Sequence, residues 1–191
     1  RAAAPTETVV CIKRLMGRWF QEDVVQETRQ RFSYSIENRE GHPKILIGDR
    51  ELSPQQVSAE FLKLLRKRAE DKLKRPVDSA VITVPAYFEE RQRTATREAA
   101  ELAGLKVRKI IDEPTAAAIA YGVRDLKSRE TVLVFDLGGG TFDISMIHMV
   151  RNRLTNEPIL EVFEINGDSW LGGSDFDARI TEYVIGEFRK K

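Results

Sequence analysis

Cysteine is almost absent from this chain of 191 residues, in which Cys11 is the only one. A single cysteine excludes an internal disulfide and fits a reducing compartment. No apolar run approaches the ~20 residues of a membrane-spanning helix, and the first residues lack the apolar core of a secretory signal. We therefore expect a soluble cytoplasmic protein with no membrane partner.

Net charge is also nearly absent, because 31 Lys and Arg residues stand against 30 Asp and Glu residues. Binding to nucleic acid usually needs a basic excess or patch, so nucleic acid is not an expected partner. His42 and His148 are far apart in the sequence and lack the paired spacing of a zinc site. An initiator methionine is missing as well, and with Arg1 in its place we interpret the chain as a fragment.

The first third of the chain predicts a helix, a hairpin and a second helix. Apolar spacing favours a helix over residues 8–18 that ends at Gly17. Residues 32–36 and 44–47 read as the strands of a hairpin, with the turn at residues 40–43. The aromatic pair Trp19 and Phe20 is interpreted as part of a core or an interface.

A long helix is predicted to begin after Ser53. Pro54 at its first position and Gln56 three residues after Ser53 form the pattern of a capping box. We expect its buried stripe to consist of Val57, Phe61, Leu64, Leu65 and Leu73. The basic residues Arg66, Lys67, Arg68 and Lys72 are expected to face water, because acidic residues are interleaved with them.

From Ser79 onward, strands and helices alternate as in an α/β protein. An apolar strand over residues 80–84 ends at Pro85, and its continuous apolar run predicts burial on both faces. The remaining elements are helices over residues 89–102 and 114–121, strands over residues 107–111 and 131–135, two antiparallel strands over residues 142–150 and 159–165, and a helix over residues 171–191. A boundary between two units is expected near residues 127–129.

A glycine-rich loop follows the strand over residues 131–135. The backbone amides of Gly138, Gly139 and Gly140 can hold phosphate oxygens, in positive φ conformations that other residues avoid, and Thr141 adds a hydroxyl. Asp136 would hold the water shell of a Mg²⁺ ion that bridges the phosphates. Asp143 lies two residues after Thr141 on the next strand and so points to the same face. The alternative is a plain glycine-rich turn with a capping aspartate.

Three further places could take part in the same chemistry. Gly172 and Gly173 open a helix whose bare N–H groups would attract an anion; the alternative is an ordinary N-capped helix. Glu113 follows a strand and could accept a proton or orient a water, or simply belong to the start of a helix. Pro85 and Arg93 fit a switch, although the local sequence favours the alternative of a proline that ends a strand and an arginine that faces solvent on a helix.

Five segments together resemble heat shock protein 70 chaperones, and the resemblance spans essentially the whole chain. They are residues 13–18 (KRLMGR), 84–88 (VPAYF), 112–122 (DEPTAAAIAYG), 135–143 (FDLGGGTFD) and 171–177 (LGGSDFD). The resemblance implies an actin-like ATPase fold, built on ribonuclease H-like sheets and incomplete here. Residues 1–75 would then be an outer subdomain of lobe I, residues 76–127 the second half of inner lobe I, and residues 128–191 the start of inner lobe II.

The resemblance also implies roles for individual residues. Lys13 corresponds to a catalytic lysine that orients the attacking water and the γ-phosphate, and Thr141 to a threonine that contacts the γ-phosphate. Catalytic and metal-site carboxylates would be Glu113, Asp136 and Asp143. The glycines that hold phosphate would be Gly138, Gly139, Gly140, Gly172 and Gly173. Pro85 and Arg93 would couple nucleotide state to peptide binding.

The expected ligands are ATP or ADP with Mg²⁺. The expected partners are a J-domain co-chaperone, a nucleotide-exchange factor, and unfolded client peptides that bind a domain absent from this chain. A stress response fits the family, as does a bacterial cytoplasm or an organelle matrix or stroma. Glu89, Glu90, Lys109 and Asp112 depart from residues that are usual in the family. Alternatives are a truncated or divergent relative that binds with little ATPase activity, or another actin-like ATPase.

Overall fold

A computed structural model of the chain describes residues 4–122, 130–155, 157–168 and 170–190. They form two compact units, one of Arg1–Ile82 with Phe88–Ile110 and the other of Thr83–Tyr87 with Ile111–Lys191. The expected boundary at residues 127–129 falls outside the described residues. Across the described ranges, no helix is both long and apolar enough to cross a membrane.

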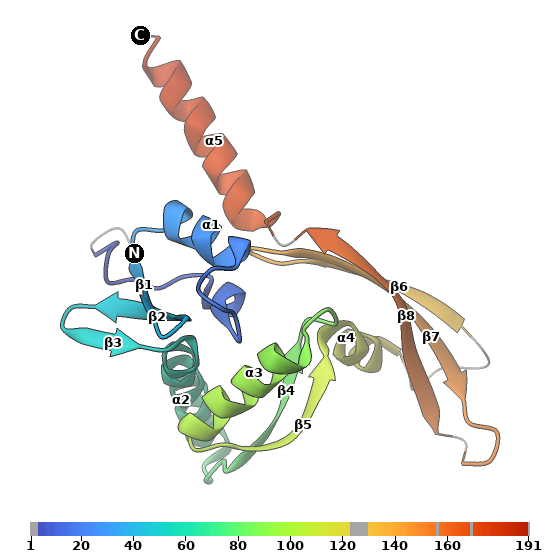
Figure 1. The fold of residues 1–191 in the computed structure, drawn as a ribbon. Helices are drawn as coiled ribbons and strands as arrows, with labels where there is room; N and C mark the ends of the chain where they lie inside the picture. Colours follow the sequence, from blue (N-terminus) through green and yellow to red (C-terminus); the bar gives the residue numbers. More distant parts are fainter. Residues whose placement is uncertain (1–3, 123–129, 156, 169, 191) are drawn as a thin grey trace. The chain divides into compact units, whose positions relative to one another are not determined.

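The first unit contains an antiparallel sheet of three strands in the order β1-β2-β3 (Figure 1). These strands are β1 (Ser35–Arg39), β2 (His42–Ile47) and β3 (Arg50–Leu52). The predicted hairpin is confirmed, but its turn is only Glu40 and Gly41, with φ values of 53° and 83°. A two-residue turn with positive φ matches the twist of the paired strands. The core beside the sheet consists of Leu15, Val25, Tyr34, Ile36 and Ile45.

The helix predicted over residues 8–18 is wrong. Only a four-residue 3-10 turn, η1 (Ile12–Leu15), forms there. Cys11 before the turn and Gly17 after it have positive φ values of 55° and 63°, which end a right-handed helix. The polar segment that follows contains a helix that the sequence did not predict, α1 (Asp23–Arg31).

Helix α2 (Pro54–Leu73) begins with the predicted capping box. The Gln56 N–H donates to Ser53 Oγ at 3.2 Å, and the Ser53 N–H donates to Gln56 Oε1 at 2.8 Å. The predicted buried stripe is largely wrong, because Phe61 is 60% exposed and Leu64, Leu65 and Leu73 are exposed as well. Of that stripe, Val57 packs against the core.

The face that α2 turns toward α3 (Glu90–Leu102) carries smaller residues and an arginine. Leu62 packs there against Ala95 and Ala99, whose small side chains let the helices approach closely. Arg66, predicted to face water, is only partly exposed, and its Nη1 donates to the carbonyl oxygens of Ala103 at 3.3 Å and Gly104 at 3.0 Å. The basic residues Lys67, Arg68 and Lys72 are exposed, as predicted.

Strands β4 (Ser79–Val84) and β5 (Lys106–Asp112) flank α3 in the sequence and form a two-stranded sheet. The prediction that β4 is buried on both faces is wrong for the described residues, because Val81 is 56% exposed while Val84 is buried. Helix α3 ends before Gly104, as predicted, and the φ of that glycine is 75°.

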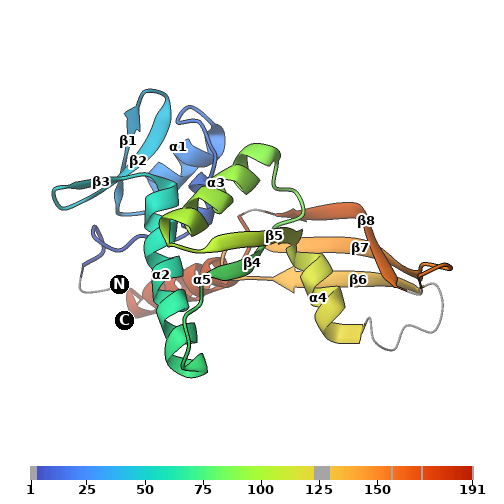
Figure 2. The same ribbon diagram turned by 90° about the horizontal axis from the view of Figure 1, so that it is seen from below.

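The second unit contains an antiparallel sheet in the order β6-β7-β8, covered on one face by helix α4 (Figure 2). Its elements are α4 (Glu113–Gly122), β6 (Glu130–Leu137), β7 (Phe142–Arg151), β8 (Pro158–Asp168) and α5 (Gly173–Phe188). Ala118 of α4 packs against Ile147 and Met149. The predicted antiparallel pairing of β7 and β8 is confirmed.

Candidate functional site

The glycine loop joins β6 to β7 and sets two carboxylates opposite each other. Asp136 near the end of β6 is the Cα partner of Asp143 near the start of β7. Because directly opposed side chains in an antiparallel pair lie on the same face, two like charges meet there, which is unfavourable without a cation nearby. Carboxylate oxygens are ligands that Mg²⁺ accepts, so the pair fits that ion.

A backbone hydrogen bond closes the glycine loop. The Gly138 N–H donates to the Thr141 carbonyl oxygen at 2.9 Å. Gly138 and Gly139 do not adopt the positive φ that the sequence predicted. At Gly139 a Cβ would meet nothing within 4 Å among the described residues, so this side of the loop is open there.

The second glycine segment packs directly onto the first. The N–H groups of Gly173 and Ser174, at the start of α5, donate to the carbonyl oxygens of Gly138 at 3.0 Å and Gly139 at 2.8 Å. The Gly172 N–H donates to Asp175 Oδ2 at 2.9 Å. These amides therefore have acceptors within the protein, contrary to the expectation that they are bare. Direct contact of Gly172 and Gly173 with phosphate stays a prediction, and packing is the role that the contacts support.

A small hollow in the second unit brings several predicted residues together. It is lined by Glu113, Asp136, Asp143 and the segment from Pro85 to Tyr87, with further walls from Pro114, Val134, Ser145 and Ile165. Pro85 is fully buried. Among the described residues, no group of three His, Cys, Asp or Glu side chains could hold a metal ion directly.

Gly167 is a residue of this site that the sequence did not single out. It pairs with Asp143 across β7 and β8. A Cβ at this position would collide with the Phe142 carbonyl oxygen and stand 3.1 Å from the Asp143 Cα, so any other residue would have to shift the backbone of β7 beside Asp143. A glycine inside a strand is itself a signal of close backbone approach, and it could have been found in that way.

Lys13 and Arg93 lie in the first unit, so the hollow of the second unit does not include them. Lys13 is exposed on η1. Arg93 is half-buried on α3, and its Nε donates to the Phe88 carbonyl oxygen at 2.8 Å. This hydrogen bond ties Arg93 to the end of the segment that begins at Pro85, so Arg93 is not only a surface charge.

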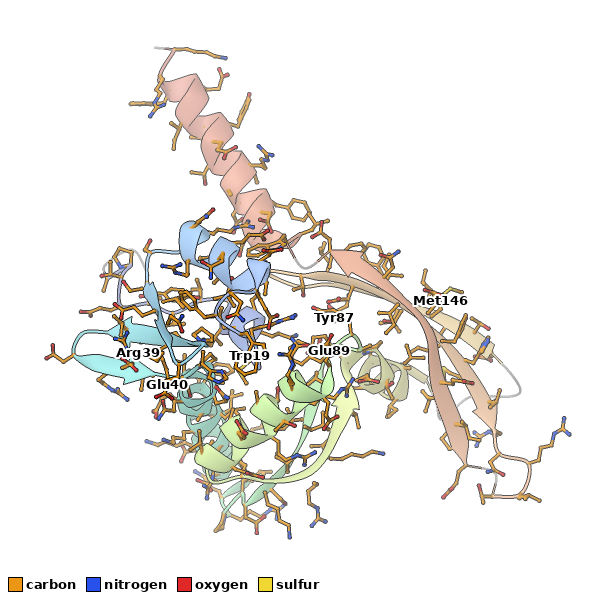
Figure 3. All side chains as sticks on the ribbon, in the orientation of Figure 1. Trp19, Arg39, Glu40, Tyr87, Glu89 and Met146 are labelled. Carbon is orange, nitrogen blue, oxygen red and sulfur yellow. The ribbon has the colours of Figure 1, made fainter. Side chains whose placement is uncertain are left out.

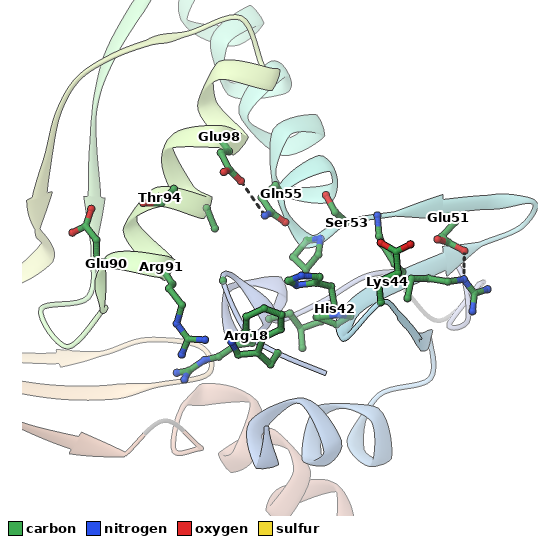
Figure 4. Close-up of a pocket in the computed structure, with 18 residues that line it drawn as sticks. Arg18, His42, Lys44, Glu51, Ser53, Gln55, Glu90, Arg91, Thr94 and Glu98 are labelled. Carbon is green, nitrogen blue, oxygen red and sulfur yellow. Dashed lines mark hydrogen bonds and ion pairs between the residues drawn. The ribbon is translucent and has the colours of Figure 1, made fainter. Parts of the chain in front are cut away.

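A larger pocket of about 830 Å³ lies in the first unit (Figure 4). Its lining includes none of the predicted site residues. The sequence did not predict it, because its walls come from η1, the β1–β2 hairpin, the start of α2 and the first half of α3.

Comparison with known proteins extends these observations. A family model described as Hsp70 protein matches residues 1–191. A chaperone protein DnaK of Buchnera aphidicola subsp. Schizaphis graminum (strain Sg) is 48% identical over 188 residues, a match that covers 98% of this chain and 29% of that protein. The chain thus spans less than a third of the length of this curated relative. The two matches confirm the resemblance that the five sequence segments indicated.

Proposed function

The chain belongs to the Hsp70 protein family, and from that premise we propose that it forms part of the ATP-binding and ATP-hydrolysing domain of a heat shock protein 70-type chaperone, which assists protein folding. The observation that carries this proposal is the packing of two glycine segments beside the opposed carboxylates of Asp136 and Asp143. Because the relative is much longer than this chain, the activity, clients and partners belong to the proposal for the whole protein.

In this proposal the open side of the glycine loop receives the phosphates of ATP. The loop would hold phosphate oxygens through backbone amides of Gly138, Gly139 and Gly140 and through the Thr141 hydroxyl. The Gly138 N–H already has the Thr141 carbonyl oxygen as its acceptor. Gly139 therefore has the best support, because a Cβ there would meet no described residue within 4 Å, its chain neighbours apart.

Mg²⁺ would be held, through water, by Asp136, Asp143 and Glu113, which line one hollow. When bound, it neutralises charge that develops on the phosphate oxygens. The chain's own residues do the rest. Glu113 orients the attacking water and its carboxylate oxygen accepts a proton, while Lys13 positions that water and the γ-phosphate. Catalysis is then mostly positioning and charge stabilisation.

The finer assignments rest on family membership. We assign the chain to an actin-like fold, with residues 1–75 in outer lobe I, residues 76–127 in inner lobe I and residues 128–191 in inner lobe II. Pro85 and Arg93 would act as a switch, supported by the bond from Arg93 Nε to Phe88. A J-domain co-chaperone, a nucleotide-exchange factor and unfolded peptides would be the partners, in a cytoplasm or an organelle matrix.

Titration calorimetry with ATP·Mg²⁺ and single-turnover hydrolysis, on the chain and on its full-length parent, test the proposal. Lys13→Ala in the parent should keep ATP binding and lose hydrolysis by about a hundredfold or more. Lys67→Ala, an exposed lysine on α2, is the matched control and should change neither. A parent that does not bind ATP would defeat the proposal. Binding without hydrolysis in the wild-type parent would favour the alternative of a binding module with little ATPase activity.

A further inference from the structure

Helix α5 leaves its apolar side chains uncovered, and none of its residues is buried. Five of these side chains are between 49% and 80% exposed: Phe176, Ile180, Tyr183, Val184 and Phe188. A helix of a soluble protein usually covers its apolar stripe with another element. An exposed apolar patch of this kind marks a surface that binds a partner.

The five residues form one stripe along α5, which we call the α5 stripe. They follow one another at intervals of four, three, one and four positions, the spacing of neighbours on one face of an α-helix. Glu187 lies on the same face, and its Oε1 is 2.6 Å from Lys190 Nζ, which offsets its charge. Arg179 and Glu182 pair with each other at 3.2 Å. Ile185 is also exposed but falls on the opposite face.

The aromatic rings of the α5 stripe have no ring partner, in contrast to an exposed ring elsewhere. Trp19 is 41% exposed, yet its ring stacks on that of His42 with 4.4 Å between the centroids, and Figure 3 shows it close to the β1–β2 hairpin. Within the part of the chain that the structure describes, Phe176, Tyr183 and Phe188 stack on no other ring. Their faces are available to a partner.

The two ends of α5 carry opposite charges. Asp175 and Asp177 lie near its start, and Arg189 and Lys190 directly follow its last residue. Asp177 and Arg189 are both exposed. Two copies of α5 side by side in opposite directions would set the acidic start of each beside the basic end of the other. The same direction would bring like charges together, which is unfavourable.

The area of the α5 stripe is enough for a specific contact between two copies. A fully buried aromatic side chain covers about 150–250 Å², and three of the five residues are aromatic. At their exposures, the five residues offer roughly 500 Å² per copy and about 1,000 Å² in a pair of helices. An area of about 1,000 Å² is the lower limit for a specific interface between proteins.

We propose that two copies of this chain associate through α5, with the helices antiparallel and the α5 stripe of each packed on that of the other. The occupant is a second copy because the charge pattern of α5 is complementary to itself in this direction. A two-fold axis makes each contact occur twice, so Asp177 and Arg189 form two ion pairs across the interface. The proposal does not depend on ATP binding.

Sedimentation equilibrium of the chain without nucleotide, over about a hundredfold range of protein concentration, tests the proposal. The wild-type chain should change from monomer to dimer as the concentration rises. Ile180→Glu should weaken the dimer by about a hundredfold or more, because it places a charge from each copy in an apolar contact. Ile185→Glu, the same substitution on the opposite face of the helix, should change the dissociation constant by less than about twofold.

The direction of the helices has its own test. Asp177→Arg should weaken the dimer by about tenfold, because it replaces two attractive pairs with two repulsive ones. The double variant Asp177→Arg with Arg189→Asp exchanges the charges and should restore the dimer to within about twofold of wild type. Failure of the double variant to recover would show that the helices do not pair in opposite directions.

Three further outcomes would overturn the proposal. One is a chain that stays monomeric at every concentration, and another is equal weakening by Ile180→Glu and Ile185→Glu. The third concerns the sheet as a different occupant. Leu133 on β6 is 59% exposed, and Leu133→Glu should leave the dimer unchanged. If it weakened the dimer as much as Ile180→Glu, the sheet of a second copy, and not its α5, would cover the α5 stripe.

Discussion

Gly172 lies so close to Gly140 that a Cβ on Gly172 would stand 2.5 Å from the Gly140 backbone nitrogen. The hydrogen bonds from Gly173 and Ser174 to the carbonyl oxygens of Gly138 and Gly139 hold the two segments in this contact. The shape of the glycine loop therefore depends on the residues that begin α5, more than 30 positions later in the chain.

Gly172→Ala should separate these segments. The added methyl group cannot be accommodated without moving backbone, so we expect a loss of stability of about 1–3 kcal/mol and weaker binding of ATP. Denaturant unfolding and nucleotide titration measure the two effects. Gly186→Ala is the control, because a Cβ there meets nothing within 4 Å; inside helix α5 it should be neutral or stabilise by about 0.5–1 kcal/mol. Equal effects of the two variants would contradict the packing role of Gly172.

Asp136→Asn should have opposite effects with and without metal. Removing one of two opposed carboxylates relieves repulsion across the strands, so the variant is expected to melt at the same or a higher temperature without Mg²⁺. Affinity for ATP·Mg²⁺ should fall, because one carboxylate of the proposed site is gone. Asp49→Asn in the first unit serves as the control for a general change of charge. A variant that kept full affinity for ATP·Mg²⁺ would remove Asp136 from the proposed site.

Arg66→Ala should loosen the packing of α2 on α3. Arg66 donates to two carbonyl oxygens beyond the end of α3 and also to Glu70 Oε1 at 3.1 Å. Hydrogen bonds with a charged partner contribute about 1.5–3 kcal/mol, and we expect a loss of this order in the free energy of unfolding. Arg68→Ala, exposed on the same helix, should cost less than about 0.5 kcal/mol. A result in which the two variants unfold alike would show that Arg66 does not join the helices.

Glu70 should make stability depend on pH. The Val77 N–H, followed by Arg66, holds the pKa of the Glu70 carboxyl below its ordinary value of 4.5. Because the folded state favours the ionised form, this contribution is present above the unfolded pKa and is lost as pH falls through the folded pKa. Glu70→Gln should therefore lower the melting temperature at pH 7, and the difference from wild type should shrink and vanish as pH falls through the folded pKa, which lies below 4.5. Glu101→Gln, at an exposed helix position, should show no such pattern.

Local signals in the sequence predicted much of the fold. The capping box of Ser53 and Gln56 formed as expected, since both hydrogen bonds join residues three positions apart. The strand before the glycine loop and the antiparallel pair after it also formed. Asp136 and Asp143 were predicted to act together, and their strand register makes them direct partners.

Packing between residues far apart in the sequence determined the features that the sequence alone did not predict. The apolar periodicity of α2 pointed to Phe61, Leu64 and Leu65, yet the face that packs on α3 is the one with Leu62 and Arg66. Helix α1 has few apolar residues, so its pattern was too weak to identify. The expected bare amides at Gly173 and Ser174 have carbonyl acceptors because the two glycine segments meet in space. The sequence of either segment alone does not indicate that the two segments pack together.

The stack of Trp19 on His42 gives the molecule a built-in optical reporter. The chain has two tryptophans, and Trp19 falls in the first unit while Trp170 falls in the second. In a Trp170→Phe variant, indole emission would come from the first unit alone and would change when the imidazole leaves the ring. In a Trp19→Phe variant it would report the second unit alone. Fluorescence can therefore tell whether the two units lose their structure in one cooperative step or in two.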